Sequence, residues 1–116
     1  MSVSYFVRYE ISAMDLAAFL RHYSEKHVPI LSRWPGIRRI VVHEALAWND
    51  PMPVNRGQAV LMAEMTFDSA EAMMSALASE GRAEARRDMH GFPPFEGTVF
   101  HQAMTSRELF RAPDAD

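Results

Sequence analysis

Cysteine is absent from this chain of 116 residues. Its absence excludes a disulfide framework, a thiolate nucleophile and a metal site with cysteine ligands. The five glycines are scattered singly, so there is no glycine-rich loop to hold a phosphate group. No apolar run approaches the ~18 residues of a membrane span, and residues 1–5 lack the basic and apolar regions of a secretory signal. We therefore expect a cytoplasmic protein without a membrane partner.

Strong charge of either sign is also missing. The formal net charge is −3, from 12 basic and 15 acidic side chains, which gives no electrostatic reason to expect nucleic acid as a partner. Hydrophobic residues make up 48% of the chain, as is ordinary for a globular protein. The length predicts a single domain over residues 1–106, followed by a loosely held tail over residues 107–116.

Hydrophobic periodicity predicts an α+β domain with the element order βαββαβ. Runs of β-branched and aromatic residues indicate strands over 3–11, 37–47, 58–67 and 97–105. Helical patterns run over 13–27, around 70–77 and, beyond a break at Gly81, over 82–89. Short connections and right-handed crossovers favour an antiparallel four-stranded, ferredoxin-like sheet in the order 4-1-3-2.

The first helix has recognisable start and stop signals. Ser12 and Asp15 have the spacing of a capping box, with Asp in the usual place of Glu. Pro29 predicts the end of the helix, because proline has no N–H to donate within a helix.

Apolar residues occupy both faces of the predicted strands. Tyr5 and Val7 alternate with Phe6, and Met62 on the third strand has the opposite parity to Met65. Two helices can cover only one face of the sheet, and an antiparallel sheet with a wet face should alternate cleanly. We therefore expect a second copy of the chain to cover the other face, giving a homodimer.

Several short motifs, in a fixed order, carry a family resemblance. They are Tyr23-Ser-Glu-Lys-His27-Val-Pro-Ile, Pro35-Gly-Ile37, Ala63-Glu-Met-Thr-Phe-Asp-Ser69 and Asp88. Together they resemble the EthD-like family of the dimeric α+β barrel superfamily, over about residues 5–104. The resemblance implies a ferredoxin-like domain that pairs through its sheet. It implies no single activity, since members include auxiliary proteins of ether breakdown and related barrels include lactone isomerases, polyketide cyclases and haem-dependent enzymes.

Acid–base chemistry is the one kind of catalysis for which the sequence offers candidates. Tyr23 and His27 lie four residues apart on the apolar face of the first helix, where burial can shift the histidine pKa. His27 is then either a core histidine with a satisfied hydrogen bond or a general acid or base. We take Tyr23, His27 and His101 as the catalytic candidates. His22 lies off the apolar face and is expected to be solvated.

A small-molecule pocket is expected beside these residues, suited to an aromatic or alicyclic ligand. The substrate-binding candidates are Tyr5, Phe19, Trp34, His43, Met62, Glu64, Phe92 and Phe95, and the turn between the last two is a possible lid. No His-x-x-x-His spacing is present, so we expect no metal site and no cofactor.

Three classes of function stay open. The first is a cofactor-independent enzyme of isomerase, cyclase or decarboxylase type, acting on a small aromatic, polyketide-like or lactone compound in a catabolic or secondary-metabolic pathway. The second is a ligand-binding or accessory protein of a degradation pathway. The third is a haem-binding barrel with an axial histidine, which the related barrels make conceivable.

Overall fold

Two long antiparallel strands, β1 (Ser2–Ala13) and β4 (Phe95–Ser106), pair along their whole length in the computed structural model, which describes residues 2–115. On the other side of β1 lies β3 (Leu61–Phe67), and β2 (Arg39–Glu44) pairs with β3 at the edge. The order β2-β3-β1-β4 confirms the predicted four-stranded, ferredoxin-like antiparallel sheet.

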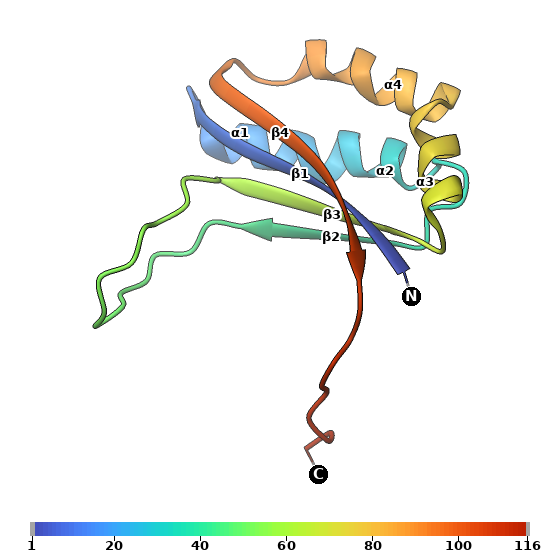
Figure 1. Ribbon diagram of the computed structural model, residues 1–116. Helices are drawn as coiled ribbons and strands as arrows, with labels where there is room; N and C mark the ends of the chain where they lie inside the picture. The colour runs from blue at the N-terminus through green and yellow to red at the C-terminus, as the bar shows by residue number, and fades with distance from the viewer. Residues whose placement is uncertain (1, 116) are drawn as a thin grey trace.

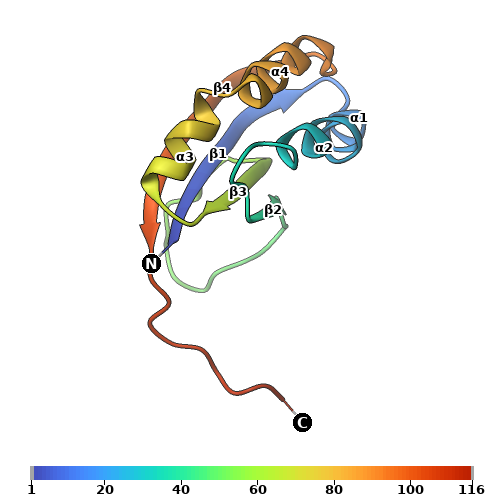
Figure 2. The same cartoon turned by 90° about the vertical axis from the view of Figure 1, so that its right-hand side faces the viewer.

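All helices lie on one side of this sheet (Figures 1 and 2). The first helical segment is continuous through α1 (Leu16–His22), the π-helical turn η1 (Tyr23–His27) and α2 (Val28–Leu31). The second comprises α3 (Ala70–Leu77), α4 (Glu80–Asp88) and the 3₁₀ turn η2 (Met89–Gly91). None of the helices within residues 2–115 is long and apolar enough to cross a membrane.

The first helical segment begins and ends later than the sequence predicts. Ser12 is part of β1 and pairs with Glu96, so the cap is Asp15, whose carboxylate accepts the Ala18 N–H at 3.0 Å. The segment also continues past Pro29. The π turn closes with the Val28 N–H donating to the Tyr23 carbonyl, and proline then falls in the first turn of α2, where its missing N–H is tolerated.

The edge strand and its neighbour are shorter than predicted. We expected strands over 37–47 and 58–67, but pairing covers only β2 and β3 as given above. Beyond Glu44 the Ala45 N–H still donates to the Val60 carbonyl, and residues 46–59 then form a loop without regular secondary structure.

The break between α3 and α4 lies at Ala78 and Ser79 rather than at Gly81. The Ser79 hydroxyl accepts the Arg82 N–H and starts α4, so that Gly81 lies in the first turn of that helix. A Cβ atom at Gly81 would lie 2.9 Å from Cδ1 of Trp34. The missing side chain therefore allows α4 to pack closely against Trp34.

The two faces of the sheet differ in how they are covered. Every second residue of β1, from Tyr5 to Ile11, is buried beneath the helices, as are Leu61, Ala63, Met65 and Phe67 of β3. No helix in the described part of the chain covers the opposite face (Figure 1), where Phe100 and Met104 remain exposed. The loop and residues 107–115, which have no regular secondary structure, carry further exposed apolar side chains, including Leu46, Trp48, Met52, Leu109 and Phe110.

Candidate functional site

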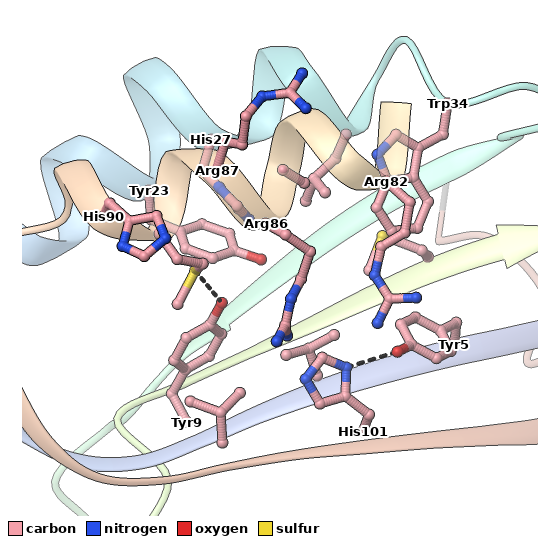
Figure 3. A pocket seen from close by; sticks show the side chains of 16 residues that line it. Tyr5, Tyr9, Tyr23, His27, Trp34, Arg82, Arg86, Arg87, His90 and His101 are labelled. Carbon is pink, nitrogen blue, oxygen red and sulfur yellow. Dashed lines mark hydrogen bonds between the residues drawn. The ribbon is translucent and has the colours of Figure 1, made fainter. Parts of the chain in front are cut away.

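A cavity of about 370 Å³ lies between the covered face of the sheet and the helices (Figure 3). The strands supply its floor, and η1, α2 and α4 supply its walls. The lining residues from the sheet are Tyr5, Val7, Tyr9, Met65, Val99 and His101. Those from the helical side are Tyr23, His27, Leu31, Trp34, Arg82, Ala85, Arg86, Arg87, Met89 and His90.

At one end of the cavity, His27 is held by a carboxylate. Its Nδ1 lies 2.9 Å from Oδ2 of Asp88, and the same oxygen lies 3.1 Å from Nε2 of His22. The last residue of α4 thus joins two histidines of the first helical segment. His22, expected in solvent, is only 17% exposed because this bond and the ring of Phe92 draw it inward.

Burial and hydrogen bonding determine the charge of this group. Burial lowers the pKa of His27, and the hydrogen bond and negative charge of Asp88 only partly oppose that shift. Burial would raise the pKa of Asp88, but the hydrogen bonds from His27 and His22 outweigh it and leave that pKa below its ordinary value. At neutral pH, Asp88 is therefore ionised and His27 is uncharged.

These charges fix the position of the imidazole proton. An ionised carboxylate only accepts hydrogen bonds, so Nδ1 of His27 must carry the proton and donate it to Asp88. Nε2 then has a free lone pair, and within residues 2–115 it has no hydrogen-bond partner. Because the side chain lines the cavity, Nε2 is the ring nitrogen available to a ligand.

Two tyrosines lie beside His27. The Tyr23 and His27 rings are 5.0 Å apart, and the Tyr9 ring meets Tyr23 edge-on at 5.6 Å. Burial raises the pKa of both phenols above the ordinary value of 10.0, so both hydroxyl groups stay protonated. The Tyr9 hydroxyl donates to Sδ of Met89 at 3.9 Å, which is a weak acceptor (Figure 3). The Tyr23 hydroxyl can donate to a ligand, and the Tyr9 hydroxyl can do so in place of its bond to the sulfur.

A second polar group lies on the floor, where β1 and β4 pair. The Tyr5 hydroxyl lies 2.6 Å from Nδ1 of His101, and Arg82 and Arg86 extend from α4 toward this pair (Figure 3). Burial lowers the pKa of His101, and the two positive charges lower it further, so this ring is also neutral at pH 7.

The structure brings together some of the candidate residues and separates others. Tyr23, His27, His101, Tyr5 and Trp34 surround the one cavity described above. Phe19, Phe92 and Phe95 do not line it, because their rings pack on one another behind the imidazoles. Phe92 is buried, with its ring 5.1 Å from that of His27, so the turn supports the histidine and is not a lid.

His43, Met62 and Glu64 lie on the opposite face of the sheet. In the register, His43 pairs with Met62, and Glu64 pairs with Phe6, whose parity is opposite to that of Tyr5. His43 Nε2 instead lies 3.2 Å from Glu64 Oε1 on the uncovered face. These three residues therefore do not line the pocket, contrary to expectation. The strands carry apolar residues on both faces, so the sequence pattern does not indicate which face the helices cover.

Asp88, Arg82 and Arg86 were not among the site residues expected from the sequence. Asp88 was part of the family motif, but its role depends on how α4 packs against η1. Arg82 and Arg86 are four residues apart and therefore share a face of α4, which is the one signal that could have indicated them. Within residues 2–115, no group of three or more His, Asp or Glu side chains is arranged to hold a metal ion.

The fold is that of a ferredoxin-like α+β protein, with a cavity between the sheet and the helices. Residues 12–93 match the model of the EthD domain, and the chain belongs to the EthD family. It is similar to an uncharacterized 11.0 kDa protein encoded in the thcB-thcC intergenic region of Rhodococcus erythropolis. The two are 32% identical over 78 residues, which is 67% of this chain and 72% of the relative.

Solved structures share the fold at lower identity. An EthD family protein from Bacillus halodurans is 24% identical with a TM-score of 0.74, over 92% of this chain and 100% of the other. SnoaB from Streptomyces nogalater, a cofactor-independent oxygenase, is 17% identical with a TM-score of 0.59, over 92% and 94%. A dimeric ferredoxin-like protein of unknown function from Thermobifida fusca is 5% identical with a TM-score of 0.66, over 91% and 92%.

Proposed function

We propose that this protein is a cofactor-independent acid–base enzyme with His27 as its general base. The observation that carries the proposal is the hydrogen bond between Nδ1 of His27 and Asp88, which leaves the unprotonated Nε2 free beside the cavity. A base with a pKa near or below neutrality is unprotonated at working pH and can accept a proton from a bound substrate.

The reaction class follows from what the neighbouring groups offer. Nε2 removes a proton from carbon next to a carbonyl group, and the resulting imidazolium is stabilised by the negative charge of Asp88. The negative charge that develops on the carbonyl oxygen needs a hydrogen-bond donor, which the protonated hydroxyl of Tyr23 or Tyr9 provides. Return of the proton to another carbon completes an isomerisation. In a cyclisation the enolate carbon attacks a second carbonyl group of the substrate, and the oxygen of that group takes the proton. In a decarboxylation Nε2 instead takes the proton of a β-keto acid, CO2 leaves, and the same proton goes to the carbon that CO2 has left.

The cavity supports a compact, ring-containing substrate. Its volume of about 370 Å³ lies at the small end of the range for small-molecule sites. Tyr5, Tyr9, Tyr23 and Trp34 supply aromatic walls. We propose a small aromatic, polyketide-like or lactone compound. SnoaB, a cofactor-independent oxygenase, has a similar fold and supports the proposal only in that an enzyme without a cofactor can have this fold.

Ligand binding without turnover is the second candidate, for an accessory role in a degradation pathway. The low exposure of His27, at 5%, favours it, because a buried and hydrogen-bonded imidazole also fits a purely structural role. The same cavity would then bind the compound and release it unchanged.

Deuterium exchange separates the two candidates even when the product has not been identified. A panel of aryl ketones, β-keto acids and lactones is incubated in D₂O with the protein, and loss of the proton next to the carbonyl is followed by NMR. Catalysed exchange in at least one class, lost in His27→Gln, is the expected result. Compounds that bind in the cavity yet exchange no faster than in buffer would favour the accessory role.

We also propose that the chain functions as a homodimer through the uncovered face of the sheet. On that face Phe100 and Met104 are exposed, and Trp48 in the loop and Leu109 and Phe110 in the tail are further exposed apolar side chains. Large apolar side chains left exposed on an uncovered face are typical of an interaction surface. The dimeric ferredoxin-like protein from Thermobifida fusca supports the pairing of two chains with this fold.

A further inference from the structure

The cavity has an unbalanced charge that the proposed acid–base chemistry does not use. Among its sixteen lining residues there are three arginines and no aspartate or glutamate. This contrasts with the chain as a whole, whose formal net charge is −3. Positive charge is therefore concentrated at the cavity.

The three acidic side chains of α4 are all paired elsewhere. Glu80 binds Arg87 at 2.7 Å, and Glu84 binds Arg33 at 3.0 Å. Asp88 is paired with His27 and His22, as described above. Within residues 2–115, no ion pair joins Arg82 or Arg86 to an acidic side chain, and Arg82 makes only a long 3.4 Å contact with the Leu77 carbonyl.

The direction of the arginines separates them into two kinds. Arg82 and Arg86 extend across the cavity toward Tyr5 and His101, whereas Arg87 points away from them (Figure 3). Arg82 is half-buried and Arg86 is exposed at the cavity mouth. The positive charge of both arginines acts on the floor of the cavity. It adds to burial in lowering the pKa of His101, and it partly offsets the burial that raises the pKa of Tyr5.

A further donor without a partner lies in the same wall. The indole N–H of Trp34 is the one buried side-chain nitrogen or oxygen in the described residues that makes no hydrogen bond. Trp34 is 4% exposed and lines the cavity beside the start of α4. A buried donor without an acceptor is unfavourable, so a ligand that brings an acceptor would be stabilised here.

We infer that the ligand of this cavity is a carboxylate, whose anionic group lies between Arg82 and Arg86 above the Tyr5–His101 pair. The two guanidinium groups provide the forked donors that carboxylate oxygens fit, in a site where no protein carboxylate competes. The inference names a substrate class for the proposed function. Binding of the carboxylate does not depend on that function, but the statement that the bound carboxylate reacts rests on it.

The test compares two ligands of one shape, 2-naphthoate and the uncharged 2-naphthamide, whose binding is measured by titration calorimetry. The wild-type protein should bind the carboxylate at least about tenfold more tightly, as expected when a charge-assisted hydrogen bond is gained. Arg82→Gln with Arg86→Gln should remove this preference. The control is Arg87→Gln, which removes one positive charge from the same helix at a guanidinium that points away from Tyr5 and His101 and pairs with Glu80. It should preserve the preference.

Three results would overturn the inference: equal binding of the two ligands, a preference that survives the loss of both arginines, and no saturable binding of either ligand to folded protein. His27→Gln separates the inference from the proposed function, since it should keep the preference for 2-naphthoate while losing deuterium exchange. Deuterium exchange limited to uncharged compounds would contradict the inferred carboxylate ligand but not the proposed enzymatic function. Preferential binding of the carboxylate without any catalysed exchange would contradict the enzymatic function but not the inferred ligand.

Discussion

On each side of this sheet a histidine is bonded to a carboxylate, in very different surroundings. On the helix-covered side, His27 and Asp88 are 2.9 Å apart with side-chain exposures of 6% and 17%. On the uncovered side, His43 and Glu64 are 3.2 Å apart with exposures of 48% and 25%. The chemical groups are the same, but only His27 lines the cavity, and only its pair with Asp88 is shielded from water. Burial, rather than the pairing itself, makes His27 the candidate base.

Loss of the buried imidazole should have the largest effect in this comparison. His27→Gln removes the basic Nε2, so the rate of catalysed deuterium exchange should fall ~10²-fold or more, the scale of a general base. His43→Gln is the matched change on the other face and should alter the rate by no more than about twofold. Equal rate losses in the two variants would remove the distinction between the faces.

The two carboxylates should differ in what they contribute to stability. Asp88→Ala leaves the ring N–H groups of His27 and His22 without an acceptor, and should lower the free energy of unfolding by about 1–3 kcal/mol. Glu64→Ala breaks a solvent-exposed pair and should cost no more than about 1 kcal/mol. Urea denaturation of both variants measures the difference, and a larger loss in Glu64→Ala would contradict it.

The uncovered face should decide the assembly state. Phe100→Arg places a second positive charge beside Arg8, whose guanidinium lies 4.7 Å from the Phe100 ring, and should shift a dimer to monomers. Light scattering should give twice the mass of one chain for the wild type and a single-chain mass for the variant. Met74→Arg changes an exposed residue of α3 and should leave the dimer intact. A monomeric wild type at micromolar concentration would refute the proposed dimer.

The covered face should also make stability depend on pH. Because the folded-state pKa of His27 lies below its ordinary value of 6.5, the unfolded chain binds the proton more readily. The free energy of unfolding should therefore fall as the pH drops through 6.5, and level off below the folded-state pKa. His101 has the same sign of shift, so His27→Gln should reduce this dependence without abolishing it. Stability that rises on acidification from pH 7 to 5.5 would contradict the burial argument.

The sequence predicted the element order and the sheet, because strand and helix periodicities are local signals. It also placed Tyr23 and His27 together, since residues four positions apart lie on the same face of a helix. It could not assign Met62 and Glu64 to a face, because apolar residues occur at both parities of β3. Nor could it pair Asp88 with His27 across 61 positions, which depends on how α4 packs against η1.

Direct observation of the His27 ring tests the central claim, that Asp88 holds its proton on Nδ1 and leaves Nε2 as a base. Long-range ¹H–¹⁵N NMR spectra of the ¹⁵N-labelled protein, recorded from pH 8 to 5, report both the tautomer and the pKa of each histidine. We predict that His27 is protonated on Nδ1 at neutral pH and titrates below 6.5. A proton on Nε2 at neutral pH, or a pKa above 6.5, would contradict the account.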